Sequence, residues 1–164
     1  MKASTKLHGE DEGMHHEGIR PRIKVVNSSL GHLLLGDGTL IVVRVAVVDV
    51  RVTQRQSPFG AEFGVDLTTG VSSRSPHEVL EKFRDKRILA PGERPPDSWQ
   101  QLRIDEKEPA VEEVEFEDSE LGKYRIRVEL EPIMVSVNTD VRTARGEPLY
   151  VVRWVPKVSW KKVE

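Results

Sequence analysis

Residues 39–53 read TLIVVRVAVVDVRVT, and this stretch decides the class of the fold. Valine and isoleucine lose side-chain freedom in a helix but pack well on a pleated sheet, so the stretch predicts one long β-strand. From Leu40 to Val48 both faces are apolar apart from Arg44, which predicts that this half lies between two layers of protein. Beyond Val48 polar and apolar residues alternate, so the strand should end half exposed.

The composition predicts one aliphatic, β-rich domain. The chain has 164 residues with 23 Val, 7 Ile and 13 Leu, against 4 Phe, 3 Trp and 2 Tyr. A chain of this length can form one domain with a full core. We expect that domain over residues 19–164, after a tail at residues 1–18 that has no apolar periodicity and stays mobile.

A turn should end the long strand at residues 57–60 (SPFG), where proline and glycine occupy positions that a type I turn prefers. A hairpin centred on this turn sets Arg51 opposite Asp66, so that unlike charges meet. A register shifted by two residues would instead place Asp49 opposite Asp66. We therefore expect the first register.

The second half predicts another hairpin, with a register fixed by charge. Acidic and apolar residues alternate over 111–117, and basic and apolar residues alternate in the returning strand from residue 123. Pairing Glu117 with Lys123, Glu115 with Arg125 and Glu113 with Arg127 sets unlike charges opposite each other. The apolar parity then switches at Pro132, which predicts a bulge or corner there because proline cannot join a central ladder.

One helix is predicted at about residues 76–87. Ser75 is placed to cap it, Pro76 suits the first helical position, and Glu78 completes a capping box. Together these elements predict a mainly β fold, with two packed antiparallel sheets or a partly open β-barrel, and the helix covering one end.

Several chemistries are excluded by the residues that the chain lacks. It has no cysteine, which excludes disulfides, thiolate nucleophiles and Cys-ligated metal centres. Neither GxxxxGK nor GxGxxG occurs, and no Ser, His and acid set has motif spacing. We expect no cofactor and no common enzymatic activity, although carboxylate chemistry leaves little trace in one sequence. No segment approaches the ~20 apolar residues of a membrane helix, so we expect no membrane partner and a cytoplasmic location.

The N-terminal tail holds the only histidine cluster of the sequence, with His8, His15 and His16 among acidic residues. Imidazole and carboxylate groups bind transition metals. Adjacent histidines in a flexible tail lack the fixed geometry and the outer hydrogen bonds of a working site, so we expect no metal site.

The C-terminal segment interleaves basic and aromatic residues. Residues 139–164 hold 6 bases and 3 acids, whereas residues 105–131 hold 11 acids and 4 bases. Stacking on indole rings and phosphate contacts from Lys and Arg suit single-stranded DNA or RNA. The candidate residues are Arg153, Trp154, Lys157, Trp160, Lys161 and Lys162. The net charge of −2 argues against this interpretation, because a nonspecific binder usually has a stronger basic balance.

Assembly is the interpretation that we favour. A long Val-rich strand needs covering on both faces, one helix covers only part of a sheet, and the acidic and basic segments offer complementary patches to a second copy. Arg44 has apolar neighbours, so it should reach an acidic partner or lie in a subunit interface.

We therefore expect a non-enzymatic interaction module that is homo-oligomeric or binds another protein. Its charge-rich composition, with few Asn and no Cys, is typical of a thermophile. The alternatives are nucleic-acid binding, as above, and a small molecule held in a cavity of the β-barrel or sandwich that is lined by Val and Met134.

Overall fold

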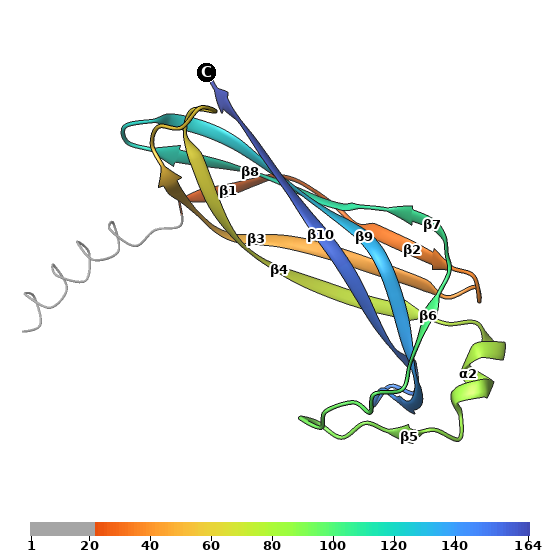
Figure 1. Cartoon of the computed structure of the whole chain (residues 1–164). Coiled ribbons are helices and arrows are strands. Elements are labelled where there is room, and N and C mark those ends of the chain that lie inside the picture. Colours follow the sequence, from red (N-terminus) through yellow and green to blue (C-terminus); the bar gives the residue numbers. More distant parts are fainter. Residues whose placement is uncertain (1–21) are drawn as a thin grey trace, which may run out of the picture.

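The structure is a computed structural model that describes residues 22–164. This part of the chain forms two packed sheets and one helix, which confirms the predicted mainly β fold (Figure 1). The predicted mobile tail and its histidines lie outside the described residues. In chain order the elements are β1 (Ile23–Ser29), β2 (Gly31–Leu35), β3 (Leu40–Gln54), β4 (Glu62–Arg74), α2 (His77–Phe83), β5 (Arg87–Ile88), β6 (Trp99–Leu102), β7 (Ile104–Glu108), β8 (Ala110–Asp118), β9 (Gly122–Arg142) and β10 (Pro148–Val163).

The larger sheet is organised around β9, which is 21 residues long. Its strand order is β1-β8-β9-β10, and β5 and β6 pair with the second half of β9. The smaller sheet has the order β4-β3-β2-β7. The long β9–β10 ribbon carries the larger sheet from the C-terminal end of the molecule to the end that holds α2 and β5 (Figure 1). Neither sheet closes on itself within residues 22–164, so the fold is a sandwich with free edges.

The core fills the space between the two sheets. Phe116 and Ile126 of the larger sheet and Leu33 and Ile41 of the smaller one have almost no exposed surface. Burying side chains of this kind stabilises a fold by about 1.5–3 kcal/mol each. The core therefore fixes which face of each strand points inward.

Strand β3 forms as predicted, but its first half is not buried on both faces. Its odd-numbered residues from Ile41 to Val47 are buried, and Val50 is buried after a register shift at Val48. The extra residue of a bulge switches which parity faces the core. The buried residues are odd-numbered before the bulge and even-numbered after it, although they all lie on the same face of β3. The outer face is partly exposed, with Val48 61% exposed.

The predicted β3–β4 register was wrong by two residues. Val50 lies opposite Val65, and Asp49 lies opposite Asp66. The turn forms at the expected place, since Gly60 N–H donates to the Ser57 carbonyl oxygen at 3.0 Å. Irregularities in β3 then shift the pairing, which brings Phe63 into ring contact with the core.

The β8–β9 hairpin has the predicted register, with Glu115 opposite Arg125 and Glu113 opposite Arg127. The predicted break at Pro132 is also present. The ladder with β10 shifts between Pro132 and Met134, and β8 stops pairing with β9 at Leu130. The inward parity switches at this bulge, which explains the parity change in the sequence.

Helix α2 is shorter than predicted and is capped differently. It spans His77–Phe83, its N-cap is Pro76, and no side chain caps it. The hydroxyl of Ser75, predicted to be the cap, instead contacts Thr39 Oγ1 at 3.2 Å and Tyr150 OH at 3.0 Å. A tertiary contact has replaced the local one.

Candidate functional site

Strand β4 is a long free edge of the smaller sheet. It has 13 residues, and within residues 22–164 it pairs only with β3. Every residue from Thr68 to Ser72 is exposed. A free edge presents unpaired backbone N–H and C=O groups to any strand that can pair with them. This edge is therefore a ready site for hydrogen bonding to another chain.

The other edges carry features that oppose such pairing. Strand β7 has only five residues, IDEKE, and four of them are charged. Strand β1 has a register shift between Val25 and Asn27, and β5 and β6 have two and four residues. Strand β10 contains Pro156, several lysines and two register shifts. Short strands, charges, proline and bulges all discourage edge-to-edge association.

Strand β4 lacks these features over its second half. Residues 67–73 read LTTGVSS, with neither a charged residue nor a proline, and their pairing with β3 is regular. Val71 pairs with the buried Val43 and so points to the core side of the sheet, yet it is 52% exposed. An uncharged, regular edge with an exposed valine fits a partner strand.

Arg44, the predicted interface residue, lies beside this edge. It is exposed on the outer face of β3 and sits directly opposite Gly70 of β4. A Cβ placed on Gly70 would meet none of the described heavy atoms within 4 Å. Arg44 therefore has open space over the edge strand.

The two ends of this edge carry opposite charges. Asp66 accepts a hydrogen bond from Arg51 Nη1 at 2.7 Å on the exposed face. Arg74 is exposed at the other end, where it borders a surface hollow of about 260 Å³ together with Arg145 and Glu147. Strand β4 thus carries an acidic residue toward one end, where Arg51 of β3 partly neutralises it, and a basic residue at the other.

The six residues predicted to bind nucleic acid all lie on β10, but they do not form one surface. Trp154 and Trp160 are half-buried and pack against the core, and Trp160 meets the ring of Phe63 edge to face at 5.4 Å. Arg153, Lys157 and Lys161 are exposed at alternate positions, so they point to the opposite side of the strand. Lys162 has the same parity as the two indoles but is exposed.

Met134, predicted to line a cavity between the sheets, instead borders a surface hollow of about 360 Å³. Trp99, which is 38% exposed, lines the same hollow with Ser136, Val151 and Arg153. The exposed indole near Arg153 is therefore Trp99 of β6. The local sequence pattern does not predict that Trp99 lies beside β9, because β6 and β9 pair with each other although strands β7 and β8 lie between them in the chain.

Three hydroxyl groups meet where β3 begins and β4 ends. Tyr150 OH lies 3.0 Å from both Thr39 Oγ1 and Ser75 Oγ. Burial raises the pKa of Tyr150, and the two hydrogen bonds partly oppose that rise. Because Tyr150 belongs to the larger sheet and the other two residues flank strands of the smaller one, this cluster links the two sheets. Within residues 22–164 neither a histidine nor a lysine is hydrogen-bonded to these hydroxyls, so no general base activates them as nucleophiles.

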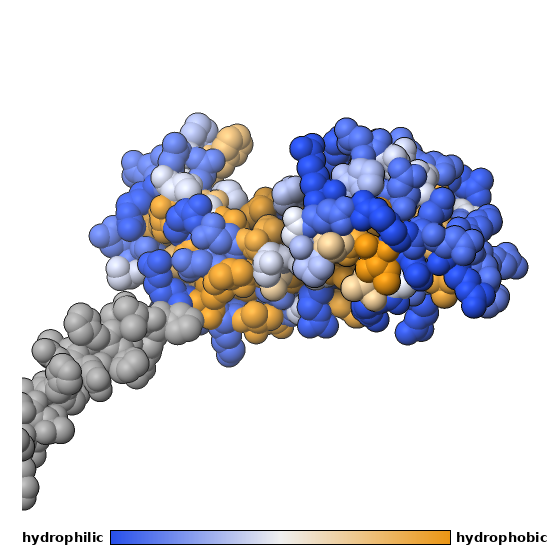
Figure 2. All heavy atoms as spheres, turned by 90° about the horizontal axis from the view of Figure 1, so that it is seen from below, coloured by the Kyte–Doolittle hydropathy of each residue, from blue (hydrophilic) through white to orange (hydrophobic). Residues whose placement is uncertain are grey.

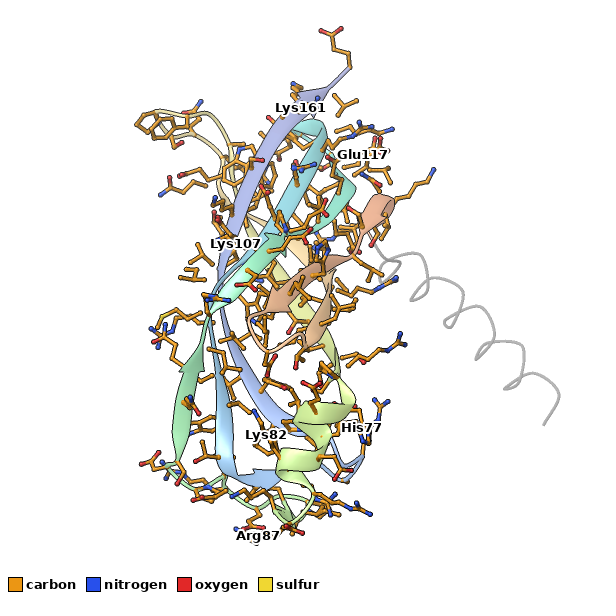
Figure 3. All side chains as sticks on the ribbon, turned by 90° about the vertical axis from the view of Figure 1, so that its right-hand side faces the viewer. His77, Lys82, Arg87, Lys107, Glu117 and Lys161 are labelled. Carbon is orange, nitrogen blue, oxygen red and sulfur yellow. The ribbon has the colours of Figure 1, made fainter. Side chains whose placement is uncertain are left out.

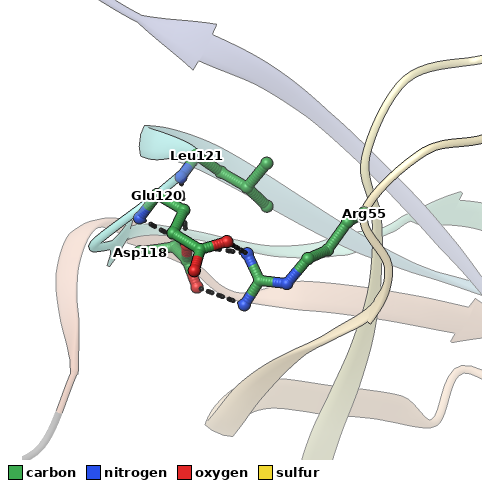
Figure 4. Close-up of polar contacts among 4 residues, drawn as sticks. All are labelled: Arg55, Asp118, Glu120 and Leu121. Atoms are coloured by element: carbon green, nitrogen blue, oxygen red, sulfur yellow. Dashed lines mark hydrogen bonds and ion pairs between the residues drawn. The ribbon is translucent and has the colours of Figure 1, made fainter.

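A second link between the sheets joins the β3–β4 loop to the β8–β9 turn. Arg55 donates to Asp118 Oδ1 at 3.2 Å and to Oδ2 at 3.4 Å, and its Nη1 lies 3.0 Å from Glu120 Oε2 (Figure 4). The backbone N–H groups of Leu121 and Glu120 also donate to Asp118. These N–H groups first, and Arg55 next, lower the pKa of Asp118 to about 2.

The part of the chain that the structure describes holds no cluster of three or more His, Cys, Asp or Glu side chains able to bind a metal. No helix there is long and apolar enough to cross a membrane. No family model, curated protein or solved structure matches the chain. The free sheet edges and the surface hollows are therefore the candidate binding features of the described residues.

Proposed function

We propose that this protein is a self-assembling interaction module in which β4 of one copy pairs antiparallel with β4 of a second copy. The observation that carries the proposal is the contrast among the edges, since β4 is the long edge without charges, proline or bulges over residues 67–73. Pairing across a two-fold axis would join the two smaller sheets into one.

The charges of β4 select one register for this pairing. In an antiparallel two-fold pair, residues of the same parity face each other, so Gly70 can lie opposite Gly70 of the second copy. That register sets Asp66 of each copy opposite Arg74 of the other, and Thr68 opposite Ser72. All of these side chains share the outer face of the strand. Unlike charges directly opposite each other stabilise a ladder, by about 0.2–1 kcal/mol per pair.

Arg44 has a place in this interface. It lies one strand away from the two-fold axis, beside Gly70, and glycine leaves the space over the edge free. Its long stem can extend across Gly70 toward the outer face of the second copy. Arginine is enriched in interfaces because its planar head forms several hydrogen bonds.

Pairing by an edge also suits the distribution of apolar side chains. Figure 2 shows them in separate patches between hydrophilic residues, on the face seen from below. Specific interfaces between flat faces need well-packed apolar cores, whereas an added strand gains affinity mainly from backbone hydrogen bonds.

Light scattering of the full chain tests the proposal, with one variant on the edge and one away from it. We expect a dimer at high micromolar concentration, and a monomer for Val71→Lys, because a lysine at an edge opposes a partner strand. Val48→Lys is the matched control, since Val48 is also an exposed valine, on the outer face of β3.

The two variants also separate edge pairing from packing of sheet faces. If Val48→Lys yields a monomer and Val71→Lys remains a dimer, the outer face is the interface and the edge is not. A wild-type chain that stays monomeric at several hundred micromolar would refute self-assembly itself. Circular dichroism of each variant verifies that the fold is kept.

A further inference from the structure

A second candidate site lies on the outer face of the larger sheet, away from β4. Here β9 and β10 border a surface hollow of about 350 Å³. This volume is at the lower end of the range of small-molecule sites. The lining residues are Glu113, Arg125, Arg127, Ser159, Trp160 and Lys161. Lys161 lies toward the end of the molecule opposite α2 (Figure 3).

The hollow brings three cations together. Lys161 lies directly opposite Arg125 in the β9–β10 ladder, and Arg127 is two residues further along β9. Like charges directly opposite each other destabilise a ladder. The strand pairing alone therefore gives no reason for Lys161 to lie beside Arg125, and an anion between them would relieve the repulsion.

The carboxylates nearby neutralise only part of this charge. Glu115 Oε1 accepts from Arg125 Nη2 at 3.2 Å, and Glu113 Oε1 accepts from Arg127 Nη1 at 2.7 Å. Each contact engages one guanidinium nitrogen. Among the described residues, Lys161 forms no ion pair, and Arg125 Nε is shielded from solvent without an acceptor. Lys161 therefore keeps its donors free at the hollow, whereas Arg125 Nε is out of reach of a ligand bound there.

We infer that this hollow binds the phosphate group of a small phosphate monoester. The donors are the guanidinium groups of Arg125 and Arg127, the ammonium of Lys161 and the hydroxyl of Ser159. Arginine forks match the oxygen geometry of phosphate, and lysine adds a point charge. A monoester carries close to two negative charges at neutral pH. Two of the three cations are each already paired with one carboxylate, Glu115 or Glu113, so among the described residues the unpaired charge at the hollow is that of Lys161. Ser159 is small, so it leaves room for the ester group beside Arg127.

This site is independent of the β4 edge, because it lies on the other sheet. Its test is titration of the ¹⁵N-labelled full chain with ribose 5-phosphate at low salt, followed by NMR. We expect saturable shifts of the Arg127 side-chain signals and of the Ser159 and Lys161 backbone amide signals. Lys161→Gln and Arg125→Gln should each weaken binding about tenfold or more, as expected for loss of a hydrogen bond to a charged group.

Lys162→Gln is the matched control, since it removes the same charge one residue along β10 from a side chain that does not line the hollow. It should leave binding within about twofold of wild type. Equal weakening by Lys161→Gln and Lys162→Gln would overturn the site in favour of general charge attraction. Absence of any shift at ribose 5-phosphate concentrations on the order of 10 mM would also overturn the proposed site.

Two further ligands distinguish the source of the phosphate. Inorganic phosphate should bind at the same signals, more weakly if the ester group also contacts the hollow. A mixed-sequence single-stranded oligonucleotide should bind less tightly per phosphate than ribose 5-phosphate, because each phosphodiester carries one charge. If the oligonucleotide binds more tightly, and Lys157→Gln weakens it, the monoester inference is wrong and a nucleic-acid surface takes its place.

Discussion

Arg44 lies directly across the β3–β4 ladder from Gly70, so an exposed arginine of the long strand stands beside a glycine at which an added Cβ would meet none of the described heavy atoms within 4 Å. Gly70 has an ordinary, negative φ, so the turn-forming property of glycine is not what this position uses. What matters here is that glycine has no side chain, so another strand and the stem of Arg44 can approach closely at this free edge.

The proposed register predicts a charge-reversal result. Arg74→Asp would place two acidic pairs across the interface, because the two-fold axis repeats each contact. We expect the dimer to weaken by about 1–2 kcal/mol, which is roughly tenfold in dissociation constant, as measured by sedimentation. The double variant Asp66→Arg with Arg74→Asp should restore much of the affinity. Failure of the double variant to dimerise more tightly than Arg74→Asp would reject this register.

A loss of stability in acid follows from Asp118. Its pKa is lowered to about 2 in the folded protein, mainly by backbone N–H groups and then by Arg55. The unfolded value is about 3.9, so the stabilisation is complete above pH ~4 and is lost as the pH falls toward ~2. Thermal unfolding across this range should show a smaller pH dependence in Asp118→Asn.

The control for that measurement is Asp85→Asn. Asp85 is exposed and forms no ion pair within residues 22–164. This variant should keep the full acid dependence of the wild type. If both variants have the same profile, the contacts of Asp118 do not contribute to stability.

A loss of stability in alkali follows from Tyr150. Burial raises its pKa above the ordinary value of about 10, so the folded state favours the neutral phenol. The neutral Tyr150 phenol therefore contributes to the free energy of unfolding fully below pH ~10, and this contribution is lost as the pH rises through the pKa of the folded state. Tyr150→Phe should remove that component and cost about 1 kcal/mol in free energy of unfolding at neutral pH, because two hydrogen bonds are lost. Tyr124→Phe, at the other tyrosine of the chain, should retain the alkaline dependence.

The sequence predicts the two hairpins with different success, and the reason is physical. In the β8–β9 pair, charges alternate along both strands, so only one register satisfies Glu113, Glu115 and their arginines. In the β3–β4 pair, the single contact of Arg51 with Asp66 can be made directly or diagonally. Packing of Phe63 in the core and irregularities in β3 decided between the two, and neither can be read from local pattern.

Tertiary contacts account for the other differences. The local signals around Ser75 indicate a helix cap, yet its hydroxyl is used by Thr39 and Tyr150, which are distant in sequence. The position of β4 at a free edge was likewise not predicted, because the sequence of one strand does not indicate the order of strands in the sheet. The uncharged run LTTGVSS was the available signal.

The most direct test of edge pairing is a disulfide at the proposed axis. The chain has no cysteine, so Gly70→Cys introduces a single thiol. Residues directly opposite in an antiparallel pair have Cα atoms about 4.5–5.5 Å apart, within the range that a disulfide spans. Under mild oxidation we predict rapid and nearly complete formation of a covalent dimer by Gly70→Cys, seen on non-reducing gels and by mass spectrometry, and little by Val48→Cys. A Gly70→Cys protein that remains monomeric, or that cross-links no faster than Val48→Cys, would contradict the account.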